Sequence, residues 1–153
     1  MDDLIIREAH LDDLPGLLKF EQGVIHAERP YDDQIRPGSI QYYDLAALIQ
    51  GQDSVVMVAE YQGELIASGY ADIRVQKPYY LGDRYAYLGF MYVLPAYRGN
   101  NIINHILDAI KLWSADRSIS QLWLEVYEEN KSAIRAYQKA GFQKRLGEMR
   151  LTI

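Results

Sequence analysis

The sequence predicts an α/β (α+β) fold, a mixed and mostly antiparallel sheet with helices on both faces. Three consecutive strand-like runs occupy the middle of the chain, over residues 54–61, 64–75 and 84–94, and short connections favour an antiparallel meander. Further on, two segments with helical spacing enclose one more strand over residues 121–127. That late βαβ unit requires a parallel pair, so the sheet should be mixed.

The first third of the chain is expected to supply one strand and two helices. Residues 4–7 form a short apolar run that fits a strand. A helix should follow, because leucines recur at roughly helical spacing behind aspartates that can cap it, and it should stop before Pro30. Residues 26–39 are polar and contain two prolines, which predicts a loop. A second helix is expected from about Ser39, with Gly51 after its end.

The remaining elements follow from turn signals and a change of period. Residues 62–63 should form a tight turn, because glycine at the second position tolerates positive φ. From Ile102 onward the apolar residues recur with a helical period. A last helix is expected over about 130–140, with Gly141 capping it, and residues 142–153 should supply one or two closing strands.

Composition narrows the class of protein. The chain has 153 residues, 49% of them hydrophobic and 24% charged, which fits one globular domain over residues 1–153. It contains no cysteine, so disulfides, thiolate metal sites and cysteine nucleophiles are excluded, and its three scattered histidines give no metal-ligand spacing. The thirteen tyrosines either line half-buried strands or form an aromatic wall around a substrate pocket.

The charge of the chain indicates what kind of partner it has. The formal net charge is −5, which argues against nucleic acid, since phosphate-backbone binding needs clustered Lys and Arg. It is compatible with a small cationic substrate. The N-terminus lacks the basic start and apolar run of a signal peptide, and no stretch approaches the roughly 18 apolar residues of a membrane helix. We therefore expect a cytoplasmic protein without a membrane partner.

A strand-turn-helix connection is the first candidate site. The strand that ends at Val93 leads through Arg98, Gly99, Asn100 and Asn101 into the helix from Ile102. Such a turn points unpaired backbone N–H groups into one space, and together with the helix dipole they favour a pyrophosphate. Glycine and asparagine suit this turn, because both accept the left-handed backbone that lets a ligand approach closely.

Two motifs resemble those of the GNAT superfamily of acetyltransferases. Residues 93–99 look like its V-x-P-x-Y-R-G stem, and residues 130–142 fill every fixed position of N-x-x-A-x-x-L/A-Y-x-K-x-G-F. In the R/Q-x-x-G-x-G/A core of the first motif, Asn101 replaces a glycine and Ile103 replaces the final Gly or Ala. The side chain of Ile103 either crowds the pyrophosphate or points into the core.

The resemblance implies an acetyl-CoA-dependent N-acetyltransferase with a GNAT-like fold, in which acetyl-CoA lies between two splayed strands. A primary amine attacks the thioester directly, a backbone N–H stabilises the oxyanion, and Tyr137 takes the place of the general acid that protonates the CoA thiolate. Alternatively, Tyr137 is a core residue. The cofactor contacts implied are Met91, Tyr92, Val93, Arg98, Gly99, Asn100, Asn101, Ile102, Ile103 and Asn130.

The acceptor side is less determined. The strand before the turn carries no carboxylate where many relatives place a glutamate base. Either the base comes from elsewhere, with Glu28, Asp83 and Glu125 as candidates by residue type alone, or ordered water passes the proton to bulk. In the family the loop over residues 26–39 commonly borders the acceptor, so Glu28, Tyr31 and Asp32 are candidates to bind a cationic amine. The alternative is that these charges are simply solvated. A homodimer is common in the proteins that the chain resembles.

Two competing functions are consistent with parts of the sequence. A non-catalytic acyl-CoA-binding or sensing domain would account for the missing glutamate and for the departures at Asn101 and Ile103. A nucleotide-binding or methyl-transferring α/β protein is disfavoured by the antiparallel meander.

Overall fold

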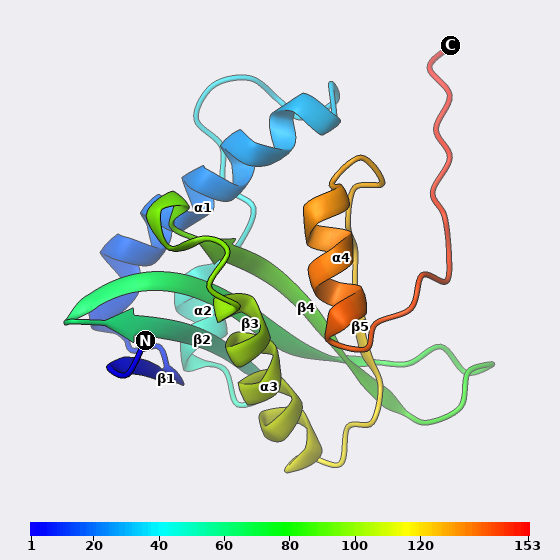
Figure 1. Cartoon of the computed structure of the whole chain (residues 1–153). Helices are drawn as coiled ribbons and strands as arrows, with labels where there is room; N and C mark the ends of the chain where they lie inside the picture. The colour runs from blue at the N-terminus through cyan, green and yellow to red at the C-terminus, as the bar shows by residue number, and fades with distance from the viewer.

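The computed structural model describes all residues 1–153 and contains one five-stranded sheet in the order β1-β2-β3-β4-β5 (Figure 1). The strands are β1 Leu4–Glu8, β2 Ser54–Tyr61, β3 Glu64–Val75, β4 Arg84–Val93 and β5 Leu122–Leu124. The α-helices are α1 Leu14–Glu28, α2 Leu45–Gln50, α3 Ile102–Ala115 and α4 Lys131–Lys139. Strands β1 to β4 pair antiparallel and β5 runs parallel to β4. The predicted mixed, mostly antiparallel sheet is therefore confirmed.

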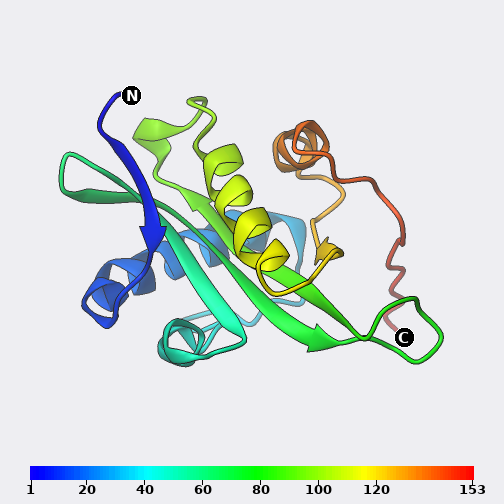
Figure 2. The same cartoon turned by 90° about the horizontal axis from the view of Figure 1, so that it is seen from below.

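Helices cover both faces of this sheet, as Figure 2 shows. Successive side chains of a strand point to opposite faces, and β2 divides its residues accordingly. Met57 belongs to the apolar cluster beneath α3, whereas Val56 and Val58 belong to the cluster beneath α1 and α2. Helix α4 packs on the same face as α3 through Tyr137 and Ala140. The two-sided burial explains why the central strands are apolar almost throughout.

The first helix ends as predicted, whereas the second begins later than predicted. Helix α1 stops at Glu28, ahead of Pro30, and a short helix follows at Arg29–Tyr31, so the loop predicted from residue 26 begins later than predicted. Helix α2 begins only at Leu45, because the backbone N–H groups of Tyr42 and Tyr43 donate to the buried carboxylate of Glu21, 3.0 and 2.8 Å away, instead of entering a helix. Asp44 then caps the helix. None of the helices has both the length and the apolar character needed to cross a membrane.

The end of the chain differs most from the sequence expectation. Strand β5 covers only three of the seven residues predicted for it, and residues 142–153 form no strand at all. From residue 143 onward the backbone makes no hydrogen bond to other backbone groups, and every side chain is exposed. The residue pattern there favours an extended backbone, and the backbone is extended, but it has no neighbouring strand within this chain.

Candidate active site

Strands β4 and β5 separate halfway along the sheet. They pair at only three positions, the last of which joins Leu88 to Leu124. Beyond that point β4 continues to Val93, while the chain after β5 turns toward α4 (Figure 1). Residues 89–93 therefore have no strand on the β5 side. This is the splayed pair that the family resemblance implies. The gap in strand pairing between the last two strands of the sheet is here called the notch.

A β-bulge shapes the β4 side of the notch. Ser68 lies opposite Tyr92 but Tyr70 lies opposite Gly89, so Phe90 and Met91 together face one residue of β3. Phe90 has φ = 60°, and the Ser68 hydroxyl donates to its carbonyl oxygen at 3.0 Å. Such a bulge bends a strand and turns its end toward a new direction. The residue pattern does not predict this bulge, because an aromatic residue at positive φ gives no sequence signal.

The bulge also explains a glycine in β3. The residue facing it is Gly69, where an added Cβ would lie only 2.6 Å from the sulfur of Met91 and 2.8 Å from a methyl group of Ile106. Any larger residue would push β4 or α3 away from β3. Close packing against this glycine therefore fixes the strand segment that borders the notch.

The turn after β4 leaves five consecutive backbone N–H groups free. Between the short helix Pro95–Tyr97 and α3, the amides of residues 99–103 donate to no backbone or side-chain acceptor in the chain. Gly99 has φ = 82° and Asn101 has φ = 62°, as predicted for this turn. Free amides at a helix N-terminus, within the positive end of its dipole, form a ready anion site.

The side chains around the turn leave its amides accessible. Arg98 donates through Nε to the carbonyl of Val93 at 3.0 Å, and Asn100 donates to the carbonyl of Tyr97 at 2.9 Å. Ile103 is half-buried against the apolar cluster beneath α3, which favours the second of its two predicted placements. An added Cβ at Gly99 would meet no atom within 4 Å. The surface above the turn is therefore open.

Sequence reasoning missed Lys139, which joins α4 to this turn. Its ammonium lies 3.3 Å from Oδ1 of Asn101, which also accepts from the side-chain amide of Asn104. Lys139 therefore brings a positive charge beside the free amides. Lys139 is the lysine of the second motif, so the sequence contained a signal for it. That it lies beside the phosphate turn follows only from the packing of α4 beside α3.

Tyr137 lies on α4, which Asn130 caps by accepting from the backbone N–H of Ala133 at 3.3 Å. The tyrosine is half-buried, and its ring centre lies 6.0 Å from that of Phe142. Burial raises the pKa of its hydroxyl to about 12, and the negative charge of Glu28 adds to the effect. The hydroxyl therefore keeps its proton at neutral pH and can donate it.

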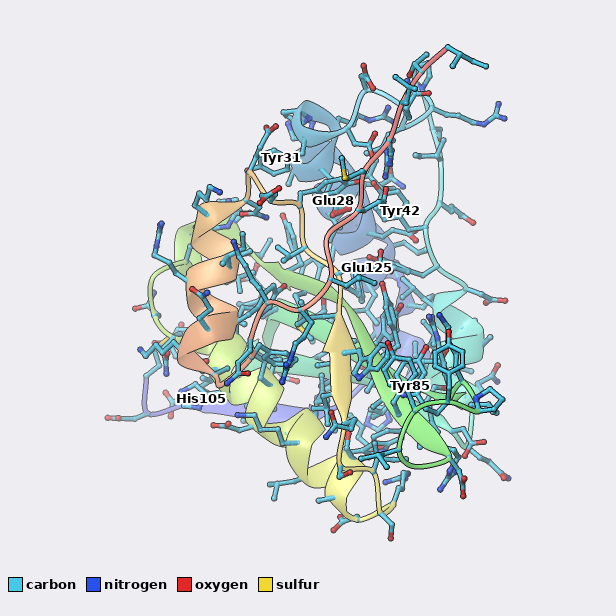
Figure 3. The ribbon with its side chains drawn as sticks, turned by 90° about the vertical axis from the view of Figure 1, so that its right-hand side faces the viewer. Glu28, Tyr31, Tyr42, Tyr85, His105 and Glu125 are labelled. Carbon is cyan, nitrogen blue, oxygen red and sulfur yellow. The ribbon has the colours of Figure 1, made fainter.

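Glu28 ends α1 close to Tyr42. Burial, followed by the charge of Asp32, raises the pKa of the Glu28 carboxyl, while a hydrogen bond with Tyr42 lowers it; the net direction is upward. Burial, followed by the negative charge of Glu28, raises the pKa of Tyr42 to about 12. Figure 3 shows Glu28 and Tyr42 near each other, with His105 away from them. Glu28 is thus a carboxyl that titrates above its usual range.

The other two base candidates have different surroundings. Glu125 is exposed and lies close to Tyr87. Burial of Tyr87 raises the pKa of its hydroxyl, and the negative charge of Glu125 adds to the effect. Asp83 precedes β4, at the end opposite to residues 89–93. Because Asp83 lies at the end of β4 that is far from the notch, Glu28 is the better candidate for the base.

Asp32 is already engaged within the chain. It accepts from the Tyr127 hydroxyl at 2.8 Å, and Nη1 of Arg150 lies 2.9 and 2.8 Å from its two oxygens. The guanidinium of Arg150, followed by the Tyr127 hydroxyl, lowers the pKa of the Asp32 carboxyl. Tyr31 lies against Tyr127, with 5.9 Å between ring centres. The three residues predicted to bind the acceptor amine, Glu28, Tyr31 and Asp32, therefore lie in one region. The carboxylate of Asp32, however, is already paired with the guanidinium of Arg150.

No group of three or more His, Asp or Glu residues in the structure is arranged to hold a metal ion. The polar side chains around the notch instead suit proton transfer and anion binding.

Comparison with known proteins identifies the class to which this fold and notch belong. Residues 20–142 match the sequence model described as "Acetyltransferase (GNAT) family". The chain belongs to the GNAT acetyltransferase family and is thus an acyltransferase. The family membership inferred from the two motifs is confirmed. No curated protein shows significant sequence similarity to the chain.

Several solved structures share the fold. A tetramutant of the BH1408 protein from Bacillus halodurans has a TM-score of 0.85 at 22% identity, covering 97% of this chain and 99% of that one. A predicted acetyltransferase from Clostridium acetobutylicum, solved with acetyl-CoA, has a TM-score of 0.76 at 22% identity, with 97% and 96% covered. An aminoglycoside 6'-N-acetyltransferase from Acinetobacter haemolyticus has a TM-score of 0.74 at 16% identity, with 97% of both chains covered.

Proposed function

We propose that this protein transfers an acetyl group from acetyl-CoA to a primary amine by direct attack within a ternary complex. The observation that carries the proposal is the run of five free amides at residues 99–103, beside the notch between β4 and β5. A pyrophosphate is an anion of the size and charge that such a turn binds. Family membership and the acetyl-CoA complex of the Clostridium structure support the same donor.

The pyrophosphate and the thioester of the donor are assigned to different groups of the chain. The amides of residues 99–103 and the ammonium of Lys139 would hold the pyrophosphate, with Arg98 at the rim. The thioester carbonyl is assigned to a backbone N–H among Met91, Tyr92 and Val93, on the strand segment turned by the bulge. Asn130 uses its side-chain oxygen to cap α4, so its amide nitrogen is the group left for a cofactor contact.

The proposed reaction needs one base and one acid. The acceptor ammonium gives a proton to Glu28, and the neutral amine then attacks the thioester carbon, forming the C–N bond. As the C–S bond breaks, the CoA thiolate takes a proton from Tyr137, and the nitrogen of the new amide loses its second proton to restore the tyrosine. The acid is suited to its role because Tyr137 stays protonated at neutral pH.

Glu28→Gln is expected to lower the acetylation rate at neutral pH by about tenfold, a modest loss because water can replace part of the base function. The raised pKa of Glu28 means that its base form is lost as pH falls through a value above the usual glutamate range. The wild-type rate should therefore show an acidic limb displaced upward from the usual glutamate pKa, and the variant should lose it. Rate measurements from pH 5 to 9 check this. Glu125→Gln is the control, and loss of the limb there instead would assign the base to Glu125.

Release of CoA tests the proposed function itself. The protein has no cysteine, so a thiol reagent reports only the CoA set free during transfer. We expect release from acetyl-CoA that depends on an added amine, tested with spermidine, glucosamine, an aminoglycoside and a lysine peptide. Binding of acetyl-CoA without release on any amine would favour the acyl-CoA-sensing alternative.

The remaining parts of the proposal concern the protein as a whole. We place it in the cytoplasm as a single domain over residues 1–153. The acceptor would be a small amine or a peptide, with Glu28 and Tyr31 beside its amino group. Asp32 could join them only after releasing Arg150, since that ion pair occupies its carboxylate.

A further inference from the structure

Helix α1 contains a carboxylate that is fully buried. Glu21 accepts through Oε2 from the backbone N–H groups of Tyr42 and Tyr43, at 3.0 and 2.8 Å. Its other oxygen, Oε1, is equally buried and has no hydrogen-bond partner. Burying a carboxylate with one oxygen unpaired costs stability. A group buried at such a cost calls for an explanation beyond packing, and the explanation lies in what its two amides hold in place.

Glu21 determines where α2 begins. The residue pattern favours a helix from about Ser39, with Tyr42 on the same face as Leu45. In the structure the carboxylate takes the amides of Tyr42 and Tyr43, and the helix starts only at Leu45. Residues 40–44 therefore lie outside any helix. Without the carboxylate, their own pattern would favour their return to the helix, which would turn the Tyr42 side chain toward the face of Leu45.

The two tyrosines that Glu21 fixes contact different parts of the candidate site. Tyr42 forms a hydrogen bond with the carboxyl of Glu28, and Figure 3 shows the two side chains near each other. The ring of Tyr43 lies 5.2 Å, centre to centre, from that of Phe90, the residue with positive φ in the bulge of β4. Two adjacent residues keep both contacts only while the backbone that joins them has one conformation. The amide bonds to Glu21 provide that constraint.

We propose that Glu21 is a positioning residue for the reaction: by fixing the backbone at Tyr42 and Tyr43, it keeps the Tyr42 hydroxyl on the carboxyl of Glu28. This role rests on the proposed function, in which Glu28 is the base. Glu21 acts only through Tyr42, because its own carboxylate is fully buried and its paired oxygen is engaged by backbone amides.

Tyr42 is the neighbour that favours the charged form of Glu28. Burial raises the pKa of the Glu28 carboxyl, the hydrogen bond with Tyr42 lowers it, and the charge of Asp32 raises it again. A hydrogen bond to a carboxylate stabilises its charged form. Loss of Glu21 should therefore raise the pKa of Glu28 further. The other ionisable groups coupled to the charge of Glu28 are Tyr43 before α2, Tyr127 after β5 and Tyr137 on α4.

Titration of the Glu28 carboxyl by ¹³C NMR tests the proposal without turnover. Protein labelled at the glutamate carboxyls is titrated free of acetyl-CoA, and the signal absent from Glu28→Gln identifies Glu28. Glu21→Leu removes the acceptor at similar volume and should raise the midpoint. Tyr42→Phe should raise it as much, and the double variant no further, because both substitutions remove the same hydrogen bond. Glu21→Gln keeps an oxygen for the two amides and should titrate near wild type.

Gln22→Ala is the matched control. Gln22 also ties α1 to this segment, by donating to the carbonyl of Ile40 at 2.9 Å, but it does not bind the two amides. The control should titrate as wild type does. An unchanged midpoint in Glu21→Leu, folded by circular dichroism, would overturn the proposal, as would an equal shift in Gln22→Ala. An unchanged midpoint in Tyr42→Phe, which keeps the buried carboxylate, would overturn it even if Glu21→Leu does not fold.

Rate measurements separate this role from the proposed function. In Glu21→Leu and Tyr42→Phe the acidic limb of amine acetylation should move to higher pH together with the midpoint, while the acetyl-CoA dissociation constant stays unchanged. A loss of stability alone would not move the limb. A protein that acetylates no amine would refute the proposed function, and the titration would still decide whether Glu21 holds Tyr42 on Glu28.

Discussion

Replacing Tyr137 with phenylalanine is expected to lower kcat by about 100-fold, with little change in acetyl-CoA affinity. The substitution keeps the ring that packs near Phe142 and removes only the hydroxyl. If that hydroxyl protonates the departing thiolate, its loss affects the transition state, and general acid catalysis is typically worth 10² to 10⁴ in rate. Burial raises the pKa of this hydroxyl to about 12, so the hydroxyl is protonated at neutral pH when the thiolate leaves.

Steady-state rates and acetyl-CoA titrations measure the two effects separately. Tyr85→Phe serves as the control, because Tyr85 lies near the start of β4, away from Glu28 (Figure 3), with its ring against Trp123 at 4.6 Å. The control should keep full activity. Equal rates for wild type and Tyr137→Phe would remove Tyr137 from the mechanism and leave it as a core residue of α4.

Replacing Gly99 with valine is expected to weaken acetyl-CoA binding by about 100-fold, which corresponds to roughly 2.8 kcal/mol. Gly99 has φ = 82°, a conformation that a β-branched residue adopts only with strain. The chain can relax only by turning the free amides of residues 99–103 away from the ligand. If the strained turn persists, the new side chain projects into the open space above it.

A second glycine separates this effect from a general loss of stability. Gly82 has φ = 78°, and an added Cβ there would also meet nothing within 4 Å, but it lies in the connection between β3 and β4. Gly82→Val should therefore cost similar stability and leave the acetyl-CoA dissociation constant unchanged. Isothermal titration of both variants makes the comparison. If Gly99→Val binds acetyl-CoA as tightly as wild type, the phosphate site lies elsewhere.

The sequence predicted the sheet and most of the turn because local residue patterns determine them. A run rich in valine defines β2, and the turn at residues 62–63 separates it from the long run of β3. Gly99 and Asn101 adopt the left-handed backbone expected of their residue types. The start of α2 was wrong because its true position depends on Glu21, which is distant in sequence and takes the amides of Tyr42 and Tyr43. A propensity pattern contains no information about such a partner.

The same limit applies to the candidate site. The two motifs identified Tyr137 and the phosphate turn, but the bulge at Phe90 depends on how β3 and β4 meet around Gly69. Glu28 was one of several carboxylates until the fold placed its charge within range of Tyr137 and Tyr42. The closing strands were predicted from residue pattern alone, but a strand also needs backbone hydrogen bonds to a neighbour, and residues 143–153 make none within this chain.

Thermal unfolding with and without acetyl-CoA tests most directly the claim that the notch and the five free amides form an acetyl-CoA site. A ligand at about 100 times its dissociation constant stabilises the folded state by roughly 2.7 kcal/mol, which raises Tm by about 5 to 10 °C in a domain of this size. We expect such a rise for the wild type and for Tyr137→Phe, and a much smaller one for Gly99→Val. No rise in the wild type at millimolar acetyl-CoA would contradict the assignment of the site.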